Sequence, residues 1–171
     1  MEKIGCRYIK IGDPLIPSNK YGIYPDGSVI NLETKTIISS FMRENEPYIN
    51  LFGTYKRTAR PVALLLAKAY LPQTEEDIRM KRDKADVIDI HKLPKINNIR
   101  WVSSLEKSII KRMKKNPPSC NRDYVEYFCE LFKHGYTVSE ACSFLHFKNK
   151  LYAANIKNRR IYSDISKNYK W

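Results

Sequence analysis

Two adjacent prolines, Pro117 and Pro118, divide the chain into two parts with different residue patterns. Proline lacks a backbone N–H and restricts the residue before it, so segment 116–119 must end any helix that reaches it. Short strand-like runs dominate before this segment, and apolar residues recur at helical intervals after it. The sequence therefore predicts an α+β protein, with a mixed domain at 1–115, a linker at 116–120 and an all-α domain at 121–171.

The first part begins with short strands and continues into a buried helix. Because β-branched and aromatic residues are frequent in them, four runs are expected to be strands: 21–24, 28–31, 36–38 and 48–52. Pro25, Asp26 and Gly27 predict a turn between the first two, since proline presets φ and glycine accepts a positive φ. A helix should begin at Pro61 and end at Pro72, and its body is apolar on most sides.

The remainder of the first part alternates between charged and apolar segments. Residues 73–84 are charged and predict a surface loop, and residues 87–90 predict a short strand. Ser103 and Glu106 have the spacing of a capping box, so a helix should start there and run to about Lys115.

The second part predicts three short helices at close spacing, over 123–134, 137–145 and 148–159. Gly135 suits the position after the first helix, and Thr137 with Glu140 forms a second capping box. Two helices joined by a tight turn, the second rich in Asn, Lys, Tyr and Arg, predict a helix-turn-helix. Three apolar side chains of the last helix are expected to pack inward: Leu151, Ala154 and Ile156.

The net charge of +13 and the pI of about 9.6 favour a polyanionic partner, most often nucleic acid. No apolar run approaches the ~18 residues that span a bilayer, and the first residues lack an apolar signal region. The cysteines show no C-x-x-C pair, which favours reduced thiols. We expect a cytoplasmic protein that binds DNA, most simply double-stranded, and no membrane.

Three motifs follow one another at short intervals: Asp-Val-Ile-Asp at 86–89, Asn-Ile-Arg-Trp-Val-Ser at 98–103 and Glu-Lys at 106–107. They resemble the core of HNH nucleases of the phage homing-endonuclease type, which reads Asp-His-Ile-Asp-Gly, Asn-Leu-Arg-Trp-Val-Thr and Glu-Asn. Residues 21–29 and 62–72 also follow the family pattern, although Ala63 and Leu64 replace its His-Arg pair. The resemblance implies a ββα-metal domain preceded by short strands and followed by a helix-turn-helix. It also implies a protein of a bacterial host cell, or a virion-associated one.

Two family residues that perform the chemistry are replaced in this chain. In the family a strand Asp and a helix Asn hold a divalent ion, and the His beside the Asp is the general base. Val87 stands at the His position and Lys107 at the Asn position. Valine cannot accept a proton, and an ammonium is a poor neighbour for a hard cation that needs several oxygen ligands. The resemblance thus implies a degenerate site with Asp86 as its one remaining ligand, Lys107 paired with Asp86 or with a phosphate, and no cofactor.

A second alignment of the loop stays open, because the interval from Asp86 to Asn98 is about one residue shorter than in the family. It would place His91 near the old active centre, with Asp89 as a ligand. The chain would then be an active nicking endonuclease that uses Asp86, Asp89, His91 and Mg²⁺ or another divalent ion. The other interpretation of His91 is a histidine in a surface loop.

Basic and amide side chains predict where nucleic acid is bound. They lie in the ribbon 53–60, at the start of helix 103–115 and in the last helix, where Asn and Arg can read adenine and guanine edges. The predicted set is Lys56, Arg57, Arg60, Lys107, Lys148, Asn149, Lys150, Tyr152, Asn155, Lys157, Arg159 and Arg160.

Four aromatic residues are expected to be structural rather than to stack on bases. Trp101 should anchor the core, and the other three should pin the tail to the helical bundle: Tyr162, Tyr169 and Trp171. The sequence predicts a DNA-binding protein without nuclease activity. Its alternatives are the nicking endonuclease and a structural component of a virion or ribosome, in which charge matters and base sequence does not.

Overall fold

The computed structural model describes residues 5–9, 20–53, 57–89 and 92–171. The chain forms two compact units, Met1–Lys107 and Ser108–Trp171. The division falls inside a helix and ahead of the predicted linker at 116–120. No helix in the described part is long and apolar enough to cross a membrane.

The first unit begins with an antiparallel sheet of four short strands. They are β1 (Arg7–Tyr8), β2 (Tyr21–Ile23), β3 (Val29–Asn31) and β4 (Thr36–Ile38), paired in that order. The predicted turn joins β2 to β3: Gly27 has φ +90° and donates its N–H to Tyr24 O at 2.9 Å. A Cβ on Gly27 would lie 2.5 Å from Pro94 O, so this turn requires glycine for space as well as for backbone conformation.

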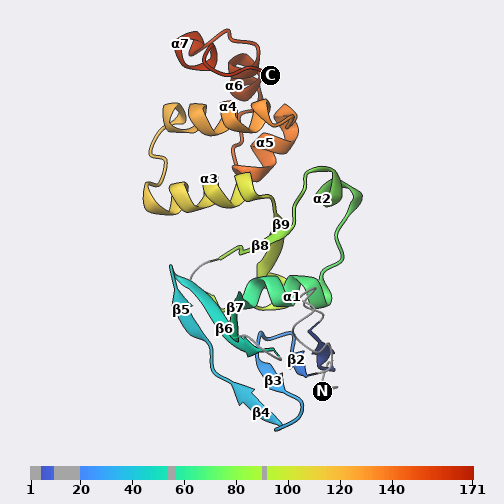
Figure 1. Cartoon of the computed structure of the whole chain (residues 1–171). Helices are drawn as coiled ribbons and strands as arrows, with labels where there is room; N and C mark the ends of the chain where they lie inside the picture. Colours follow the sequence, from blue (N-terminus) through green and yellow to red (C-terminus); the bar gives the residue numbers. More distant parts are fainter. Residues whose placement is uncertain (1–4, 10–19, 54–56, 90–91) are drawn as a thin grey trace. The chain divides into compact units, whose positions relative to one another are not determined.

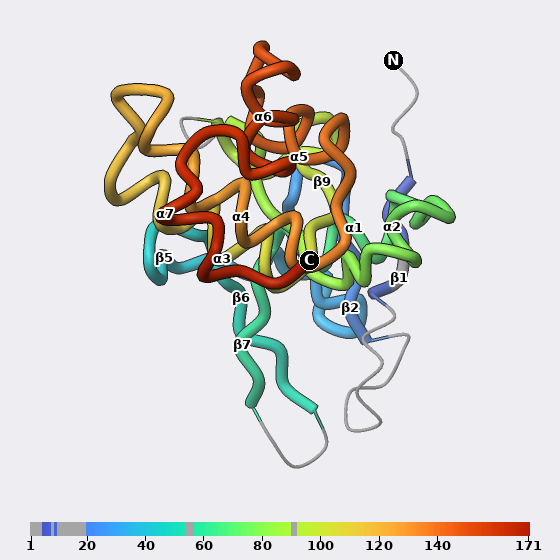
Figure 2. Tube along the Cα trace, turned by 90° about the horizontal axis from the view of Figure 1, so that it is seen from above, coloured from blue at the N-terminus to red at the C-terminus, as the bar shows by residue number. Residues whose placement is uncertain are grey.

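A second antiparallel sheet contains β5 (Phe41–Arg43), β6 (Glu46–Phe52) and β7 (Arg57–Pro61). Figure 2 shows β6 and β7 running beside each other. The sequence predicted part of β6, but β5 was missed. Its hairpin turn is made by Glu44 and Asn45, both with positive φ, a conformation that the glycine-free pair did not suggest.

Helix α1 (Val62–Tyr70) is the centre of the first unit's core. It contacts strands of both sheets and the later hairpin, as Figure 1 shows. The predicted helix and its burial are confirmed, except that Pro61 caps the helix rather than forming its first residue. Trp101 is confirmed as a core residue, and its Nε1 donates to Leu71 O at 2.9 Å just beyond the end of α1.

The surface loop predicted at 73–84 is wrong. It contains helix α2 (Glu75–Arg79), opened by a Thr74–Asp77 capping box that the charged composition concealed. Strand β8 covers Lys84–Val87, so the strand predicted at 87–90 was placed three residues too late. In β8 only Ala85 and Val87 point into the core, so the alternation of inward and outward side chains is too short to define the strand from the sequence.

The Asp77 carboxylate gives α2 a pH-dependent stability. Burial raises its pKa, but hydrogen bonds from the Thr74 N–H and hydroxyl and from Arg82 outweigh this and lower the pKa below its usual value. A lowered folded-state pKa stabilises the protein above the unfolded pKa, and this stability is lost as pH falls through the folded value.

Replacing Asp77 by asparagine should therefore destabilise the helix at pH 7 by about 1 kcal/mol, the typical cost of a lost cap. The difference between variant and parent should shrink as the pH falls below the unfolded pKa, and vanish below the lowered pKa of folded Asp77, where both side chains are uncharged. Hydrogen exchange of the α2 amides across an acidic pH series measures this. A difference that does not shrink at acidic pH would contradict the proposed charge dependence.

Strands β8 and β9 (Ile99–Val102) pair antiparallel and lead directly into α3 (Ser104–Lys115), which gives a ββα arrangement. The short helix η1 (Ile96–Asn98) precedes β9. The predicted capping box is confirmed, since Ser103 N–H donates to Glu106 Oε2 at 2.7 Å and Glu106 N–H donates to Ser103 Oγ at 3.1 Å. Helix α3 ends at Lys115, as the prolines predict.

The second unit contains η2 (Asn121–Tyr124), α4 (Val125–Lys133), α5 (Val138–Phe144), α6 (Lys150–Lys157) and α7 (Ser163–Ser166). The three predicted helices are confirmed, with the last one shorter than expected, and α7 was missed. Gly135 has φ +84° after α4, and the Thr137–Glu140 capping box opens α5. Cys129 and Cys142 are buried free thiols, and burial raises the pKa of Cys129 to about 11.

The predicted inward face of the last helix is partly wrong. Leu151 is 71% exposed, whereas Ala153 and Ile156 are completely buried and pack the helix onto the unit. Ile156 was predicted correctly, but Leu151 and Ala154 were chosen from a neighbouring apolar stripe in place of Ala153.

Candidate nucleic-acid interface

Asp86 and Val87 lie on opposite faces of β8. Val87 and its cross-strand partner Ile99 belong to the hydrophobic core, while Asp86 lies opposite Arg100 in the register of the hairpin. Both Asp86 and Val87 are buried. The position at which the family resemblance implies a general base is therefore filled by a core side chain that closes the apolar layer against α1.

Lys107 projects from the first turns of α3 toward two oxygen-bearing groups. Its Nζ donates to both Glu46 carboxylate oxygens, at 3.1 and 3.2 Å, and to Ala85 O at 3.1 Å. Glu46 begins β6, so this contact joins α3 to the second sheet and to β8. The sequence gave no reason to expect Glu46 as the acceptor, because 61 residues separate it from Lys107.

The Lys107 ammonium donates to the Glu46 carboxylate and to Ala85 O, so a hard cation bound to these same oxygens would meet a positive charge. Within the described ranges, no group of three or more His, Cys, Asp or Glu side chains could hold a metal. His91 lies outside the described residues, so the alternative that depends on it stays a prediction.

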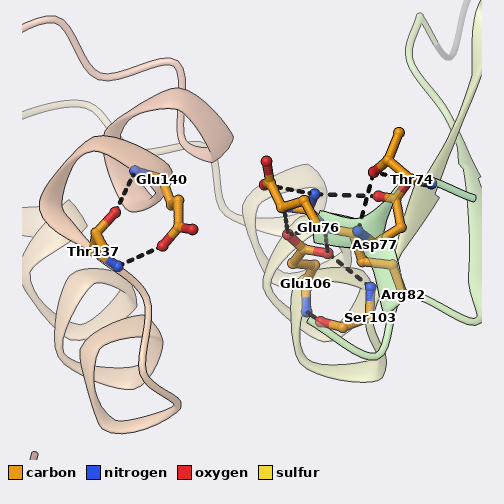
Figure 3. A network of polar contacts seen from close by, with 8 residues as sticks. All are labelled: Thr74, Glu76, Asp77, Arg82, Ser103, Glu106, Thr137 and Glu140. Atoms are coloured by element: carbon orange, nitrogen blue, oxygen red, sulfur yellow. Dashed lines mark hydrogen bonds and ion pairs between the residues drawn. The ribbon is translucent and has the colours of Figure 1, made fainter. Parts of the chain in front are cut away.

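Glu106, next to Lys107, is the centre of a buried polar network (Figure 3). Its side chain is 1% exposed and accepts from Arg82 Nε at 3.1 Å and Nη2 at 2.8 Å. Arg82 also donates to Glu76 and Asp77, at 3.1 and 3.3 Å. The network fixes the chain between α2 and β8 onto the start of α3, which positions the ββα arrangement.

Asn98 forms hydrogen bonds with the loop that joins β8 to β9. Its buried amide accepts from Asp89 N–H at 2.9 Å and donates toward Asp89 O, Lys92 O and Leu93 O at 3.0 to 3.3 Å. Asp89 also forms an ion pair with Lys92 at 2.9 Å. Asp89 is the metal ligand in the second alignment of the loop. It contacts Asn98 and Lys92 of the same loop.

Replacing Asn98 by alanine should cost about 2 kcal/mol, because it leaves buried backbone groups without their partner. Protection of the Asp89 N–H against hydrogen exchange should fall most, since Asn98 Oδ1 accepts from it directly. Asn98→Asp is the matched comparison, because it keeps the acceptor and removes the donor. If the alanine variant leaves loop protection unchanged, Asn98 does not hold the loop.

Five of the predicted contact residues in the last helix make contacts within their own unit, among them Lys150, whose Nζ donates to Ser139 Oγ at 3.3 Å. Asn149 caps α6 by accepting from Tyr152 N–H at 2.9 Å, and the Tyr152 ring lies 5.6 Å from that of Phe147. Lys157 Nζ reaches Tyr136 O at 3.4 Å. The Arg159 guanidinium lies 5.1 Å from the Trp171 ring centroid and donates to Tyr169 O at 3.0 Å.

The aromatic tail has the structural role that the sequence predicted. Trp171 Nε1 donates to Lys157 O at 3.1 Å, and its ring meets that of Phe132 edge-on at 6.0 Å. Tyr162 packs on Tyr152 at 6.1 Å between ring centroids. These contacts pin the tail to α4 and α6.

The exposed part of α6 carries Leu151 together with further predicted residues. Leu151 and Asn155 are four residues apart, so they lie on one face of the helix, and Asn155 is half-buried. Lys150 is exposed at the first position of α6, and Lys148 and Arg160 are exposed just before and just after it. A large apolar group and an amide therefore share one face of a helix flanked by cations, and Leu151 is the member that the sequence missed.

The basic ribbon divides between the two faces of the second sheet. Lys56 lies outside the described residues. Arg57 is exposed beside Phe52, whereas Arg60 lies opposite Ile49 on the face that carries the core residues. None of these positions is tested as a nucleic-acid contact by the structure, and they stay predictions.

Comparison with known proteins gives one structural match, no match to a family model and no significant match to a curated protein. A solved structure that describes DNA binding and cleavage by the HNH homing endonuclease I-HmuI aligns over 93% of each chain, with 16% sequence identity and a TM-score of 0.48. At this TM-score the likeness carries no argument, and the functional assignment depends on the contacts described above.

Proposed function

We propose that this chain is a double-stranded DNA-binding protein, built on a phage-type HNH frame, that binds without metal-dependent cleavage. DNA binding is supported by the exposed part of α6, where Leu151 and Asn155 share one face and exposed cations flank them. Two short helices, α5 and α6, are joined by a tight turn at His146, which has φ +52°, in the manner of a helix-turn-helix. The second helix of such a motif lies in the major groove.

Leu151 and Asn155 supply the base-reading groups in this proposal. An asparagine amide makes two hydrogen bonds to adenine, and an apolar side chain contacts the thymine methyl group. The two residues are separated by about 6 Å along the helix axis. Since base pairs rise by about 3.4 Å, they would read positions about two base pairs apart. Lys148, Lys150 and Arg160 would contact phosphates on either side.

The proposed lack of cleavage is supported by Lys107 and Val87. The ammonium occupies the acceptors at the position of a metal ligand, and the position of the base holds a core valine. Neither group can deprotonate water at neutral pH or stabilise the charge of a leaving oxygen as a divalent ion does.

Selection from a random duplex library tests the binding proposal. We expect a preferred site with adenine and thymine among its determinants, and Asn155→Ala should remove the preference at one position, by about 1–3 kcal/mol. Leu151→Ala should weaken a thymine preference nearby. Asn158→Ala is the matched control, because Asn158 is exposed at the far end of the same helix. Binding without any base preference would favour the structural nucleoprotein alternative.

Incubation with supercoiled plasmid and Mg²⁺ or Mn²⁺ tests the second half of the proposal. The plasmid should stay supercoiled under conditions in which the protein is bound. Metal-dependent nicking that is lost in His91→Ala would overturn the proposal and establish the nicking endonuclease.

A further inference from the structure

The second sheet has an outward face whose residues are fixed by the strand register. Phe41 lies opposite Tyr48, Asn50 opposite Ala59, and Phe52 opposite Arg57. Residues directly opposite each other in an antiparallel sheet point to the same side. Ile49 and Leu51 point to the other side, into the core. The outward aromatic face therefore contains Phe41, Arg43, Glu46, Tyr48, Asn50, Phe52, Arg57, Ala59 and Pro61.

Three aromatic side chains are unusual on the solvent side of such a sheet. Antiparallel sheets with one solvated face usually carry polar residues there. Here Phe41 is 39% and Phe52 is 52% exposed, and the Phe41 and Tyr48 ring centroids are 6.2 Å apart. Exposed aromatic surface gathered on one face indicates a binding surface rather than scattered apolar residues.

Each end of this face pairs a ring with a guanidinium. Arg43 lies 5.7 Å from the Tyr48 ring centroid, and Arg57 lies 5.6 Å from that of Phe52. The acidic residue of the face, Glu46, is held by Lys107. The face is net positive, because three cations (Arg43, Arg57 and Lys107) outnumber the single carboxylate of Glu46. A positive face complements a polyanion and disfavours a neutral apolar partner.

We propose that this aromatic face binds single-stranded nucleic acid by stacking unpaired bases on Phe41, Tyr48 and Phe52. Flat rings beside arginines match the combination of stacking and phosphate attraction by which proteins bind single strands. In a duplex the faces of the bases are covered by their neighbours, so exposed rings gain nothing from stacking there. Tyr48 and Phe52 are separated by about 14 Å along β6, which gives two stacking positions with the Asn50 amide between them.

This inference is independent of duplex binding by α6, because it depends on residues of the other compact unit. Duplex binding and single-strand stacking can therefore be lost independently. Variants of the aromatic face should leave duplex affinity unchanged, and α6 variants should leave stacking unchanged.

The full chain should be titrated with a single-stranded oligonucleotide of about 10 nucleotides, within the usual site size of such surfaces. Incorporated 2-aminopurine reports stacking through quenching of its fluorescence. Phe52→Leu keeps the apolar bulk and removes the ring, and should weaken binding about 10-fold and reduce the quenching. Phe52→Tyr should retain both, and the double variant Phe41→Leu, Phe52→Leu should lose most of the quenching.

Met42→Ala is the matched control, since Met42 is 67% exposed but lies on the opposite face of the same sheet. It should bind like the parent. Unchanged quenching in the double leucine variant would overturn the proposal, as would an equal loss in Met42→Ala. Binding of the duplex alone, with no quenching of the single strand, would also overturn it.

Discussion

Replacing Glu106 by glutamine should destabilise the first unit by about 3 kcal/mol, the cost of breaking a buried ion pair by removing one partner. Glu106 is 1% exposed and accepts from both Arg82 and the Ser103 N–H. Glutamine keeps the shape but not the charge, so Arg82 would lose its most buried carboxylate. This is a large fraction of the 5–15 kcal/mol that a typical domain has in total.

The second unit supplies a matched control for Glu106. Thr137 and Glu140 form the same type of capping box, which is also drawn in Figure 3. Because Glu140 is more exposed, Glu140→Gln should cost only about 1 kcal/mol. Two units need not unfold together, so hydrogen exchange of the amides of each unit is the suitable measurement. Equal losses in both variants would show that Glu106 acts only as a cap.

Local signals in the sequence were sufficient for most helices, and the reason is visible in the capping boxes. Ser103 with Glu106 and Thr137 with Glu140 are contacts between residues three apart, so their spacing can be read directly. The same logic applied to Thr74 and Asp77 would have found α2. It was missed because a charged composition was taken to indicate a loop.

Contacts between distant residues could not be predicted in this way. Lys107 was predicted to pair with Asp86 or with a phosphate, and its acceptor Glu46 comes from a strand 61 residues earlier. Arg82 lies in a segment with no motif, and only the fold brings it to Glu106, 24 residues away. Spacing along the chain therefore predicted local contacts, but not the distant partners of Lys107 and Glu106.

The face of a short helix was the other feature that the sequence left undetermined. In α6 the pair Ala153 and Ile156 and the pair Leu151 and Ala154 are both spaced three apart, so each gives an apolar stripe. Tertiary packing selected the first pair, and it is this choice that exposes Leu151 beside Asn155. The helix itself was thus predicted, but Leu151, which we propose reads DNA, was assigned to the core.

Removing three exposed cations at α6 and its flanks should produce the largest loss of DNA affinity. Each phosphate contact contributes about 0.9 to the slope of log affinity against log salt concentration. The variant Lys148→Ala, Lys150→Ala, Arg160→Ala should lower that slope by about 2.7 if all three side chains contact phosphate. By the same relation the loss of affinity is about 10-fold per contact near 50 mM salt, and smaller at higher salt.

A control of equal charge separates contact from overall electrostatic attraction. Lys133, Lys167 and Lys170 are exposed in the same unit but belong to other segments: Lys133 ends α4, and Lys167 and Lys170 follow α7. Replacing these three by alanine lowers the net charge of +13 by the same amount. If α6 lies in the groove, the slope changes only in the first variant, because counterions are released where phosphates are neutralised. Equal slopes in the two variants would mean that charge alone holds the DNA, and that α6 has no special role.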